Sequence, residues 1–423
     1  MNTRYFTLAL VLLTVAGTAF GSGFALFEQG AKATAMGGAF AATADDPSAI
    51  FYNVAGIAQQ RHFTVMAGGT AINFANEFRG DPNDEFTSGT TGAYARHTFM
   101  PPNAYVTVPI ANNLTFGLGL MTPFGLRTNW QAPWVGRFVS SDANVKTLDI
   151  QPALAWQSGD GRIAIGAGAD YRRGHIILQR NNGALNPFNG RITDVANVYL
   201  NSDWDSAWGY NVGVLFKPSD RFRIGASYRS DMDINFKGDA TFTQISSGNA
   251  QFDAIVKSQL PPNQKISTTL PFPATAIIGL AVTTIPKTDL EFDYTRTSWS
   301  RFKSLDIAFA TIPTLSRPEN WKDSNSYRVG VNHAATDVWD VRFGLLYDQN
   351  PEPVEAVSPL LPDADREGVT FGVGYHSGPW IVDGTVFVLH FKDRSTQGLS
   401  GEGFNGTYKT NASLLSLNLG YRF

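Results

Sequence analysis

From about residue 61 to the C-terminus, the chain divides into runs in which apolar residues alternate with small, polar or charged ones. The last run, 415–423, has an apolar side chain at every odd position and stops on Phe423. Successive side chains of a strand point to opposite faces of a sheet, so each run has one apolar and one polar face. About fourteen such runs can be counted, which predicts an all-β, antiparallel protein.

The connections between these runs alternate between tight turns and long loops. Tight turns are expected at 111–113, 158–160 and 218–220, and between them lie loops of about 17 to 30 residues. Short periplasmic turns and long extracellular loops are the pattern of outer-membrane barrels. The sequence therefore predicts a closed transmembrane β-barrel with an even number of strands and both ends on the periplasmic side.

The polar faces of several runs carry full charges in series. By the phase of the alternation, Arg221, Arg223, Arg229, Asp231 and Asp233 share the inner face of one strand. A packed protein core rarely holds so many charges, whereas a watery lumen does. We expect the polar faces to line the lumen and the apolar faces to meet lipid.

The first 21 residues have the pattern of a secretory signal peptide, with Arg4, a short apolar stretch over 6–16 and small residues before the expected cleavage after Gly21. That stretch is shorter than the roughly 20 apolar residues that span a bilayer as a helix. The next segment, 22–60, carries no alternation, although Phe24, Phe27 and Ala31 fall at helical spacing. A barrel of about fourteen strands has room for it as a lumenal plug. The expected domains are thus 1–21 signal peptide, 22–60 hatch and 61–423 barrel.

Several motifs in the N-terminal third are shared with one family. They are 23–30 (GFALFEQG), 36–40 (MGGAF), 45–56 (DDPSAIFYNVAG), 121–126 (MTPFGL) and 134–138 (WVGRF). In these motifs, in its layout and in its terminal aromatic, the chain resembles the FadL family of outer-membrane transporters for long-chain fatty acids, which has relatives serving toluene and other aromatic hydrocarbons. The resemblance departs at Val54, where the family usually has proline, so the turn is expected to be less rigid.

The resemblance implies a passive, monomeric transporter in the bacterial outer membrane, with no cofactor. Its partners would be a hydrophobic small molecule, outer-membrane lipid and, through Phe423, the outer-membrane assembly machinery. A ligand would settle in a pocket against the hatch and leave sideways through an inward kink in the third strand. The residues implied are Phe24, Leu26 and Phe27 for the pocket; Asn53, Val54 and Ala55 for the hatch turn; and Gly117, Gly119, Pro123 and Gly125 for the exit.

Two predicted loops carry apolar residues that either pack on each other or await a hydrophobic ligand. One has Phe252, Ile255, Val256 and Leu260 on one helical face, and the other has Ile192, Val195, Val198, Tyr199 and Leu200. A carboxylate ligand would also need a lumenal cation, for which Arg229 and Arg328 are candidates.

Other classes of function find little support. The formal net charge of −3 gives no reason to expect nucleic-acid binding, and cysteine is absent. The six histidines are scattered, so no metal site is expected. The GxGxxG pattern at 401–406 follows a long loop and precedes a strand, which is the wrong context for a dinucleotide site. We expect no enzyme, although an outer-membrane lipase is the enzymatic rival; the stronger alternative is a water-filled porin for small polar solutes.

Overall fold

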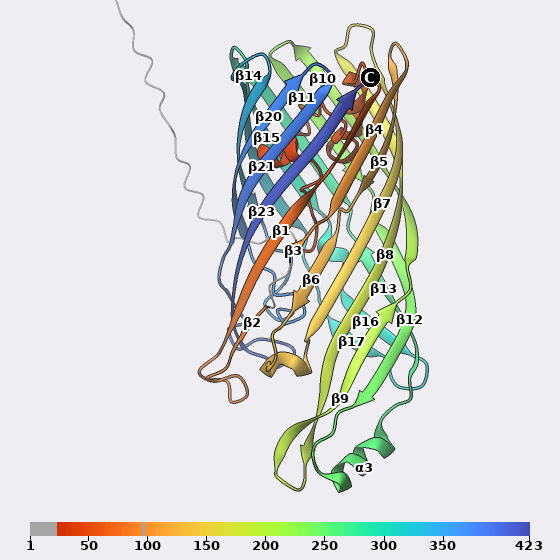
Figure 1. The fold of residues 1–423 in the computed structure, drawn as a ribbon, viewed down its shortest axis with the longest axis vertical. Helices are drawn as coiled ribbons and strands as arrows, with labels where there is room; N and C mark the ends of the chain where they lie inside the picture. Colours follow the sequence, from red (N-terminus) through yellow and green to blue (C-terminus); the bar gives the residue numbers. More distant parts are fainter. Residues whose placement is uncertain (1–22, 95–97) are drawn as a thin grey trace, which may run out of the picture.

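The computed structural model describes residues 23–94 and 98–423, so the predicted signal peptide lies outside the described residues. The chain forms a closed, antiparallel barrel of fourteen strands (Figure 1), several of which are interrupted. The barrel closes where the first strand pairs with the last, from Thr64 opposite Arg422 to Gly80 opposite Gly406. The prediction of an all-β barrel is confirmed.

In chain order, the segments of the wall are β1 (Thr64–Gly80), β2 (Thr91–Ala93), β3 (Thr98–Phe99), β4 (Pro102–Ala111), β5 (Leu114–Met121), β6 (Gly125–Asn129), β7 (Asp142–Gln157), β8 (Ile163–Asn186), β9 (Arg191–Ser202), β10 (Asp205–Ser219), β11 (Phe222–Arg229), β12 (Met232–Gln244), β13 (Gln264–Phe272), β14 (Thr275–Ile285), β15 (Thr288–Thr297), β16 (Ser304–Phe309), β17 (Leu315–Pro318), β18 (Ser324–Ala334), β19 (Trp339–Asp348), β20 (Arg366–Ser377), β21 (Trp380–Phe391), β22 (Arg394–Ser395) and β23 (Gly406–Arg422). The 3₁₀-helices η2 (Val135–Phe138) and η3 (Trp299–Arg301) and the α-helix α3 (Ala250–Gln259) lie in the connections.

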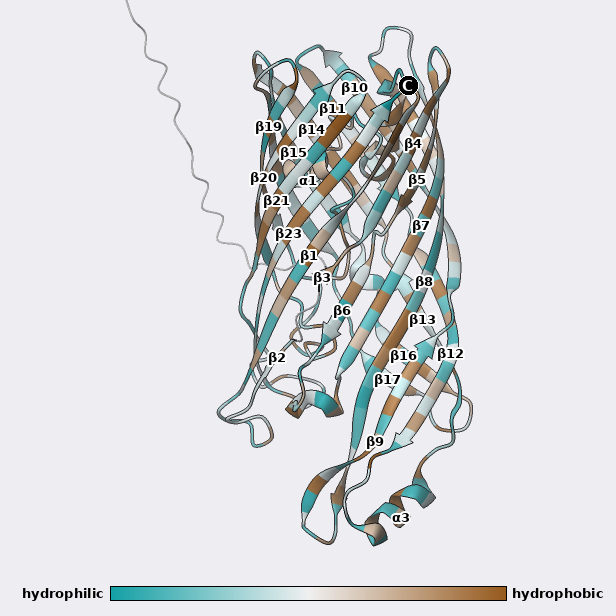
Figure 2. Cartoon of the chain, in the orientation of Figure 1, coloured by the Kyte–Doolittle hydropathy of each residue, from teal (hydrophilic) through white to brown (hydrophobic). Residues whose placement is uncertain are grey.

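The outer surface of the barrel carries an apolar band, visible as alternating colours along the strands (Figure 2). In β23 the leucines 415, 417 and 419 are exposed, while Ser416 and Asn418 between them are buried. Aromatic rings border the band at both ends. Tyr171 with Trp208 and Tyr210 with Tyr228 mark the extracellular side, and Phe63 with Phe423 marks the periplasmic side. Such girdles place the band in a lipid bilayer.

Residues 23–60 lie inside the barrel, where they form the short helices α1 (Ala31–Ala35), α2 (Ala49–Tyr52) and η1 (Val54–Gln59). Nearly all of them are buried. The segment contains short helices, as expected, but the spacing of Phe24, Phe27 and Ala31 does not mark one of them, because residues 24–29 are outside any helix and α1 begins at Ala31. No helix among the described residues is long and apolar enough to span a membrane.

Two carboxylates of β15 hold the middle of the hatch to the wall. Asp293 accepts the N–H groups of Phe40 and Ala41 over 2.9 Å each, and Glu291 accepts those of Ala42 over 2.7 Å and Thr43 over 3.0 Å. Four backbone N–H groups in a row are bonded to the wall in this way, so this part of the hatch is firmly fixed.

The seventh strand changes its phase between β11 and β12. Arg229 is buried, but in β12 the buried residues are Met232, Ile234 and Phe236, while Asp233 is exposed. The expectation that Asp233 shares the inner face with Arg229 is therefore wrong. Two residues between the strands shift the alternation by one position, which exchanges the two faces.

Candidate functional site

The third strand of the barrel is interrupted at residues 122–124, between β5 and β6. β5 forms ladders with β4 on one side and β7 on the other. β6 keeps its ladder with β7, but towards the second strand the described residues show only a single bridge, between Tyr94 and Trp130. Among residues 23–94 and 98–423, no continuous ladder joins β6 to the second strand.

The N-terminal segment covers this interruption with backbone hydrogen bonds. Ala25 forms a bridge with Phe124. The Leu26 N–H donates to the Pro123 carbonyl over 2.8 Å, and the Gly125 N–H donates to the Phe24 carbonyl over 3.0 Å. Backbone groups in a membrane protein must find partners within the protein, and here the hatch supplies them.

Phe24 fills an aromatic box that opens towards the extracellular loops. Its ring centroid lies 4.7 Å from that of Trp299 and 5.9 Å from that of Phe124. Phe272, Trp321 and Phe302 complete the box. Edge-on contacts of this kind are favourable beyond the area they bury, so Phe24 anchors the tip of the segment.

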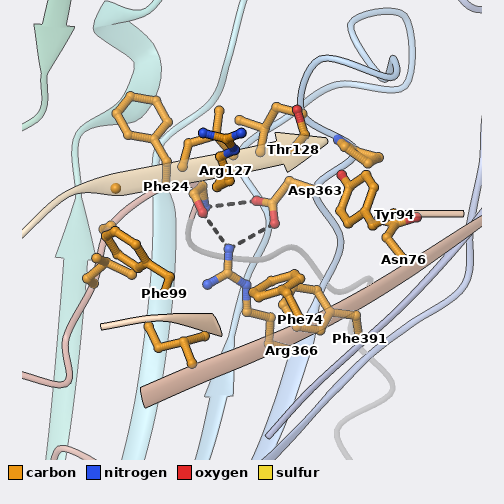
Figure 3. Close-up of a pocket in the computed structure, with 18 of the residues that line it drawn as sticks. Phe24, Phe74, Asn76, Tyr94, Phe99, Arg127, Thr128, Asp363, Arg366 and Phe391 are labelled. Atoms are coloured by element: carbon orange, nitrogen blue, oxygen red, sulfur yellow. Dashed lines mark hydrogen bonds and ion pairs between the residues drawn. The ribbon is translucent and has the colours of Figure 1, made fainter. Parts of the chain in front are cut away.

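A charged clamp holds the residue before Phe24 (Figure 3). The Gly23 N–H donates to Asp363 Oδ2 over 2.8 Å, and its carbonyl accepts from Arg366. Arg366 and Asp363 also pair with each other at 3.0 Å. Asp363 belongs to the extracellular connection between β19 and β20, so this loop folds into the lumen and contacts the hatch.

Three apolar cavities run from the extracellular loops to the interrupted strand. The outer cavity, about 530 Å³ with the open space at its mouth, lies between β8, β9, β16 and β17. The middle cavity, about 510 Å³, shares Leu178, Leu305 and Leu360 with it and reaches Phe24. The side cavity, about 880 Å³ with its mouth, shares Phe24 and Leu126 with the middle one and is bordered by β3 and β6 (Figure 3). Neighbouring cavities thus share lining residues, and Phe24 lies between the middle cavity and the side cavity.

The predicted pocket residues Phe24, Leu26 and Phe27 meet at these cavities. Phe24 and Leu26 line the side cavity, and Leu26 and Phe27 line a further hatch cavity of about 500 Å³. That cavity also contains Arg229, one of the two predicted cations.

Both predicted cations are already paired. Arg229 bonds with Asp170, and its guanidinium lies 5.2 Å from the Phe51 ring. Arg328 bonds with Asp348 at 2.9 Å and with the Gly37 carbonyl. A paired guanidinium offers less to a ligand carboxylate. Two further cations, Arg180 and Arg317, line the outer cavity.

The four residues predicted to shape the exit, three glycines and one proline, divide into two groups. A Cβ on Gly117 would lie 2.8 Å from Ile57, and one on Gly119 would lie 2.8 Å from Ile50. Both belong to the regular part of β5 and give space to the hatch. Pro123 and Gly125 lie at the interruption itself and bond to the N-terminal segment.

The hatch turn at 53–55 is held through Asn53. Its Nδ2 donates to the carbonyls of Ala41 at 2.8 Å and Val214 at 3.0 Å, and its Oδ1 accepts the Ala55 N–H at 3.2 Å. Val54 is the first residue of η1. Asn53 thus ties the turn both to the hatch and to the wall.

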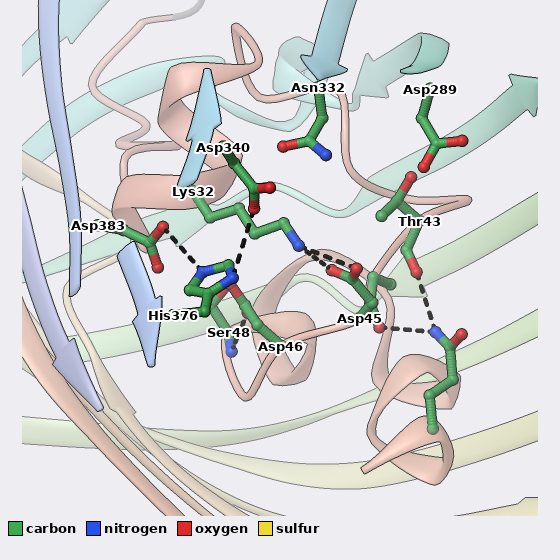
Figure 4. A network of polar contacts seen from close by, with 12 residues as sticks. Lys32, Thr43, Asp45, Asp46, Ser48, Asp289, Asn332, Asp340, His376 and Asp383 are labelled. Carbon is green, nitrogen blue, oxygen red and sulfur yellow. Dashed lines mark hydrogen bonds and ion pairs between the residues drawn. The ribbon is translucent and has the colours of Figure 1, made fainter. Parts of the chain in front are cut away.

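The side of the hatch that faces the periplasm is polar (Figure 4). Lys32 pairs with Asp45 at 2.7 Å, and His376 lies 3.4 Å from Asp340 and 3.7 Å from Asp383. Among the described residues, no group of three or more His, Cys, Asp or Glu side chains could hold a metal ion.

The predicted loop residues 252–260 lie in α3 and at its end, at the extracellular tip, whereas residues 192–200, also expected in a loop, belong to strand β9. Phe252 and Val256 of α3 are buried against Val195 of β9, while Ile255 is 45% exposed. Val256 and Leu260 line a shallow cavity of about 720 Å³ between the two loops. The structure thus shows packing between the two loops and leaves some apolar surface open.

Sequence reasoning missed the residues that hold the N-terminal segment in place. Gln29 bonds both backbone groups of Thr122, and Asp363 and Arg366 lie more than 300 positions away from Gly23. The sequence held no signal for the clamp, because its members meet only when the loop folds into the lumen. Gln29 was within a recognised motif, but its partner could not be inferred from the motif.

A closed barrel with an apolar belt, an internal hatch and a side gap bordered by an apolar cavity is an integral outer-membrane protein of the transport class. Residues 12–423 match the family model described as "Outer membrane protein transport protein (OMPP1/FadL/TodX)". The chain belongs to this family and is located in the outer membrane.

Curated relatives and solved structures agree with this assignment. The chain is 27% identical to the 47 kDa outer membrane protein of Pasteurella multocida, covering 98% of this chain and 97% of the relative. It is 26% identical to the long-chain fatty acid transport protein of Salmonella typhi, covering 87% of each. A Pseudomonas aeruginosa FadL homologue has the same fold, with a TM-score of 0.83, 22% identity and coverage of 95% and 100%. The toluene transporter TodX of Pseudomonas putida gives 0.73, 16% identity and coverage of 96% and 99%.

Proposed function

We propose that the protein is a passive channel for the uptake of hydrophobic compounds, either long-chain fatty acids or related hydrocarbons. One observation carries this proposal: neighbouring apolar cavities that share lining residues lead to the interruption of the third strand, and the N-terminal segment bonds across that interruption. The names of the relatives, a fatty acid transport protein and a toluene transporter, point to the same class of substrate.

The path has three stages. A hydrophobic molecule first leaves water at the apolar surfaces of the extracellular loops, including Ile255 and the outer cavity. It then displaces Phe24 from its aromatic box, because the middle cavity ends there. Finally it passes through the side cavity and between β3 and β6 into the membrane. Each step keeps apolar surface away from water, which is the driving force for such transfer.

Movement is proposed only for residues 23–29. This segment is held at its tip by the Gly23 clamp, in its middle by the bridge of Ala25 to Phe124, and at its end by the hydrogen bonds of Gln29 to Thr122. Residues 40–43 are held to the wall by Glu291 and Asp293. A ligand that enters the box competes with Phe24 and thereby shifts the segment away from the gap. The rest of the hatch stays in place and blocks a straight passage to the periplasm.

A water-filled porin and an enzyme are not proposed. The hatch is buried across the lumen, and the path described above is lined mainly by apolar side chains. The barrel contains all parts of its own path, which supports function as a monomer. The exposed ring of Phe423, stacked on Phe63, is the proposed contact for the assembly machinery before the barrel closes.

Two measurements on the intact protein test this function. Bacterial cells without their own fatty-acid transporter should take up radiolabelled oleate or toluene faster when they produce this chain than when they carry an empty vector. In planar bilayers the purified protein should give no large, steady ion conductance. Uptake at the empty-vector rate for both probes, or a steady open channel, would contradict the proposal.

A further inference from the structure

The barrel wall contains another stretch without a backbone ladder, between the sixth and seventh strands. On its periplasmic side, Asn211 of β10 pairs with Arg229 of β11. On its extracellular side, Ser202 of β9 pairs with Gly238 of β12. The last backbone hydrogen bonds on either side are Ser230 N–H to Tyr210 and Asp203 N–H to Lys237. Between residues 204–209 and 231–236, all of them described, no backbone hydrogen bond crosses. Six strand residues correspond to about 20 Å of wall.

The missing ladder has a cause in the phases of the two strands. The ladders on the two sides of the stretch have the same register. Continued through the stretch, this register would place Ala207 opposite Asp233. Directly opposite residues of an antiparallel pair must point to the same face. Ala207 belongs to the inner face of β10, whereas Asp233 lies on the outer face of β12. The sixth strand changes phase at 203–204 and the seventh at 230–231, and the stretch between these two points cannot form a ladder.

Side chains fill this stretch in place of hydrogen bonds. A Cβ on Gly209 of β10 would lie 2.8 Å from Met232 Cγ. Behind it, a Cβ on Gly174 of β8 would lie 2.8 Å from the Phe236 ring and 3.2 Å from Ile234. Phe236 and Ile234 belong to the same apolar cluster as Phe24. Two of the side chains that fill this stretch of the wall thus belong to the same apolar cluster as the aromatic box around Phe24.

The other edge of the β12–β13 ribbon is also loosely attached. β13 pairs with β16 only at Ile266 and Ser267. The C-terminal end of β13 carries Pro271, and Pro273 follows the strand. Proline lacks the N–H that an inner strand donates and occurs at edges and bulges. Over this stretch the ribbon can therefore move without breaking a ladder.

The outer mouth of the stretch lies at the extracellular aromatic belt. Trp208 is 68% exposed and contacts Tyr171, and Tyr210 beside it contacts Tyr228. Tyrosine and tryptophan mark the interface between bilayer and water. This stretch of the wall thus faces the outer leaflet, and the buried side chains of Met232 and Phe236 lie on its inner side.

We propose that the stretch between β10 and β12 is a second side opening, through which hydrophobic molecules pass from the outer leaflet into the cavity around Phe24. This inference rests on the proposed function, for which it adds a route of access from the membrane. Opening would move the side chains of Met232, Ile234 and Phe236 and would break no backbone ladder. In a laddered part of the wall, opening would break consecutive backbone hydrogen bonds in an apolar environment.

A disulfide across the stretch tests the proposal, because the chain contains no cysteine of its own. In Gly209→Cys/Met232→Cys the two Cβ atoms lie within reach of a disulfide, since about 1.5 Å separates Met232 Cγ from its Cβ. The control is Val214→Cys/Ala226→Cys, a directly paired position on the same two strands. Oxidation of the first pair should lower the uptake of radiolabelled oleate by at least about twofold, and reduction should restore it, while the control keeps its rate. Equal uptake in the oxidised and reduced forms of the first pair would overturn the proposal.

A second measurement does not depend on transport. In proteoliposomes, N-(1-pyrenyl)maleimide dissolved in the bilayer should label Phe236→Cys faster than Ala281→Cys, which is equally buried but lies in a fully laddered part of β14. Equal rates would overturn the side opening, whatever the uptake assay shows. If the unmodified chain takes up neither oleate nor toluene, the proposed function fails, and this labelling comparison still decides the side opening.

Discussion

Gln29 completes the backbone hydrogen bonding of Thr122 with one side chain. Its Nε2 donates to the Thr122 carbonyl over 2.7 Å, and its Oε1 accepts the Thr122 N–H over 3.1 Å. The two residues are 93 positions apart, and one belongs to the hatch while the other begins the interruption of the third strand. The kink is therefore not stable on its own, because part of its backbone depends on the hatch.

The first prediction concerns this dependence. Gln29→Leu should leave two buried backbone groups of Thr122 without partners, each at a cost of about 1–3 kcal/mol. Hydrogen exchange of the amides of Thr122, Phe124 and Gly125 should then become at least about tenfold faster. Gln59→Leu is the control, because Gln59 also uses its amide within the hatch but bonds Thr43 and Ala44. Equal protection of the kink in both variants would contradict the role of Gln29.

The second prediction is a pH dependence in the extracellular loops. Burial raises the pKa of Glu319, between β17 and β18, to about 7. This pKa lies above the ordinary value of 4.5. The protonated Glu319 side chain therefore contributes to the stability of the folded protein below pH 4.5, and this contribution is lost as the pH rises to about 7. Fully ionised, the group costs roughly 3 kcal/mol.

Glu319→Gln removes this titration. The difference in Tm between the variant and the unmodified protein should therefore grow in favour of the variant from pH 5 to pH 8. Asp306→Asn serves as the control, because serine hydrogen bonds lower the pKa of that carboxyl and its titration lies below this range. A Tm difference for Glu319→Gln that stays constant with pH would disprove the prediction.

The third prediction concerns Val54, where the family usually has proline. Val54 is the first residue of η1, a position whose N–H has no acceptor within the helix. Asn53 before it is extended, with φ −156° and ψ 102°, as a residue before proline prefers. Val54→Pro should raise stability by about 0.5 kcal/mol, seen as a higher Tm in detergent.

Ala55→Pro should do the opposite, because the Ala55 N–H donates to Asn53. The pair of variants separates a local effect of the backbone from a general intolerance of proline in the hatch. A lower Tm for Val54→Pro would show that the valine side chain or its N–H is needed.

The sequence was sufficient to predict the barrel because alternation and loop lengths are local features. Leu415, Leu417 and Leu419 indicated a lipid-facing strand before any partner was known, and the structure confirms this. The phase of a long strand was less predictable. Two residues between Arg229 and Met232 exchange the faces, and no composition signal marks such a bulge.

The candidate site was predictable only in part. The shared motifs identified Phe24, Leu26 and Phe27, which do meet at the cavities. The motifs could not identify the partners of this segment, because Asp363 and Arg366 come from a loop that folds into the lumen. The pairing of Arg229 with Asp170 and of Arg328 with Asp348 likewise depends on neighbouring strands. Contacts between distant segments are properties of the closed barrel.

The central claim is that residues 23–29 must leave the third strand before a molecule can pass. A disulfide in Ala25→Cys/Phe124→Cys would join the two residues of the bridge, whose spacing suits such a bond. Val329→Cys/Leu345→Cys, a directly paired position of β18 and β19, is the control. Oxidation should lower the uptake of radiolabelled oleate by the first variant by at least about tenfold, with full recovery after reduction and no change in the control. Undiminished uptake by the oxidised first variant would contradict the account.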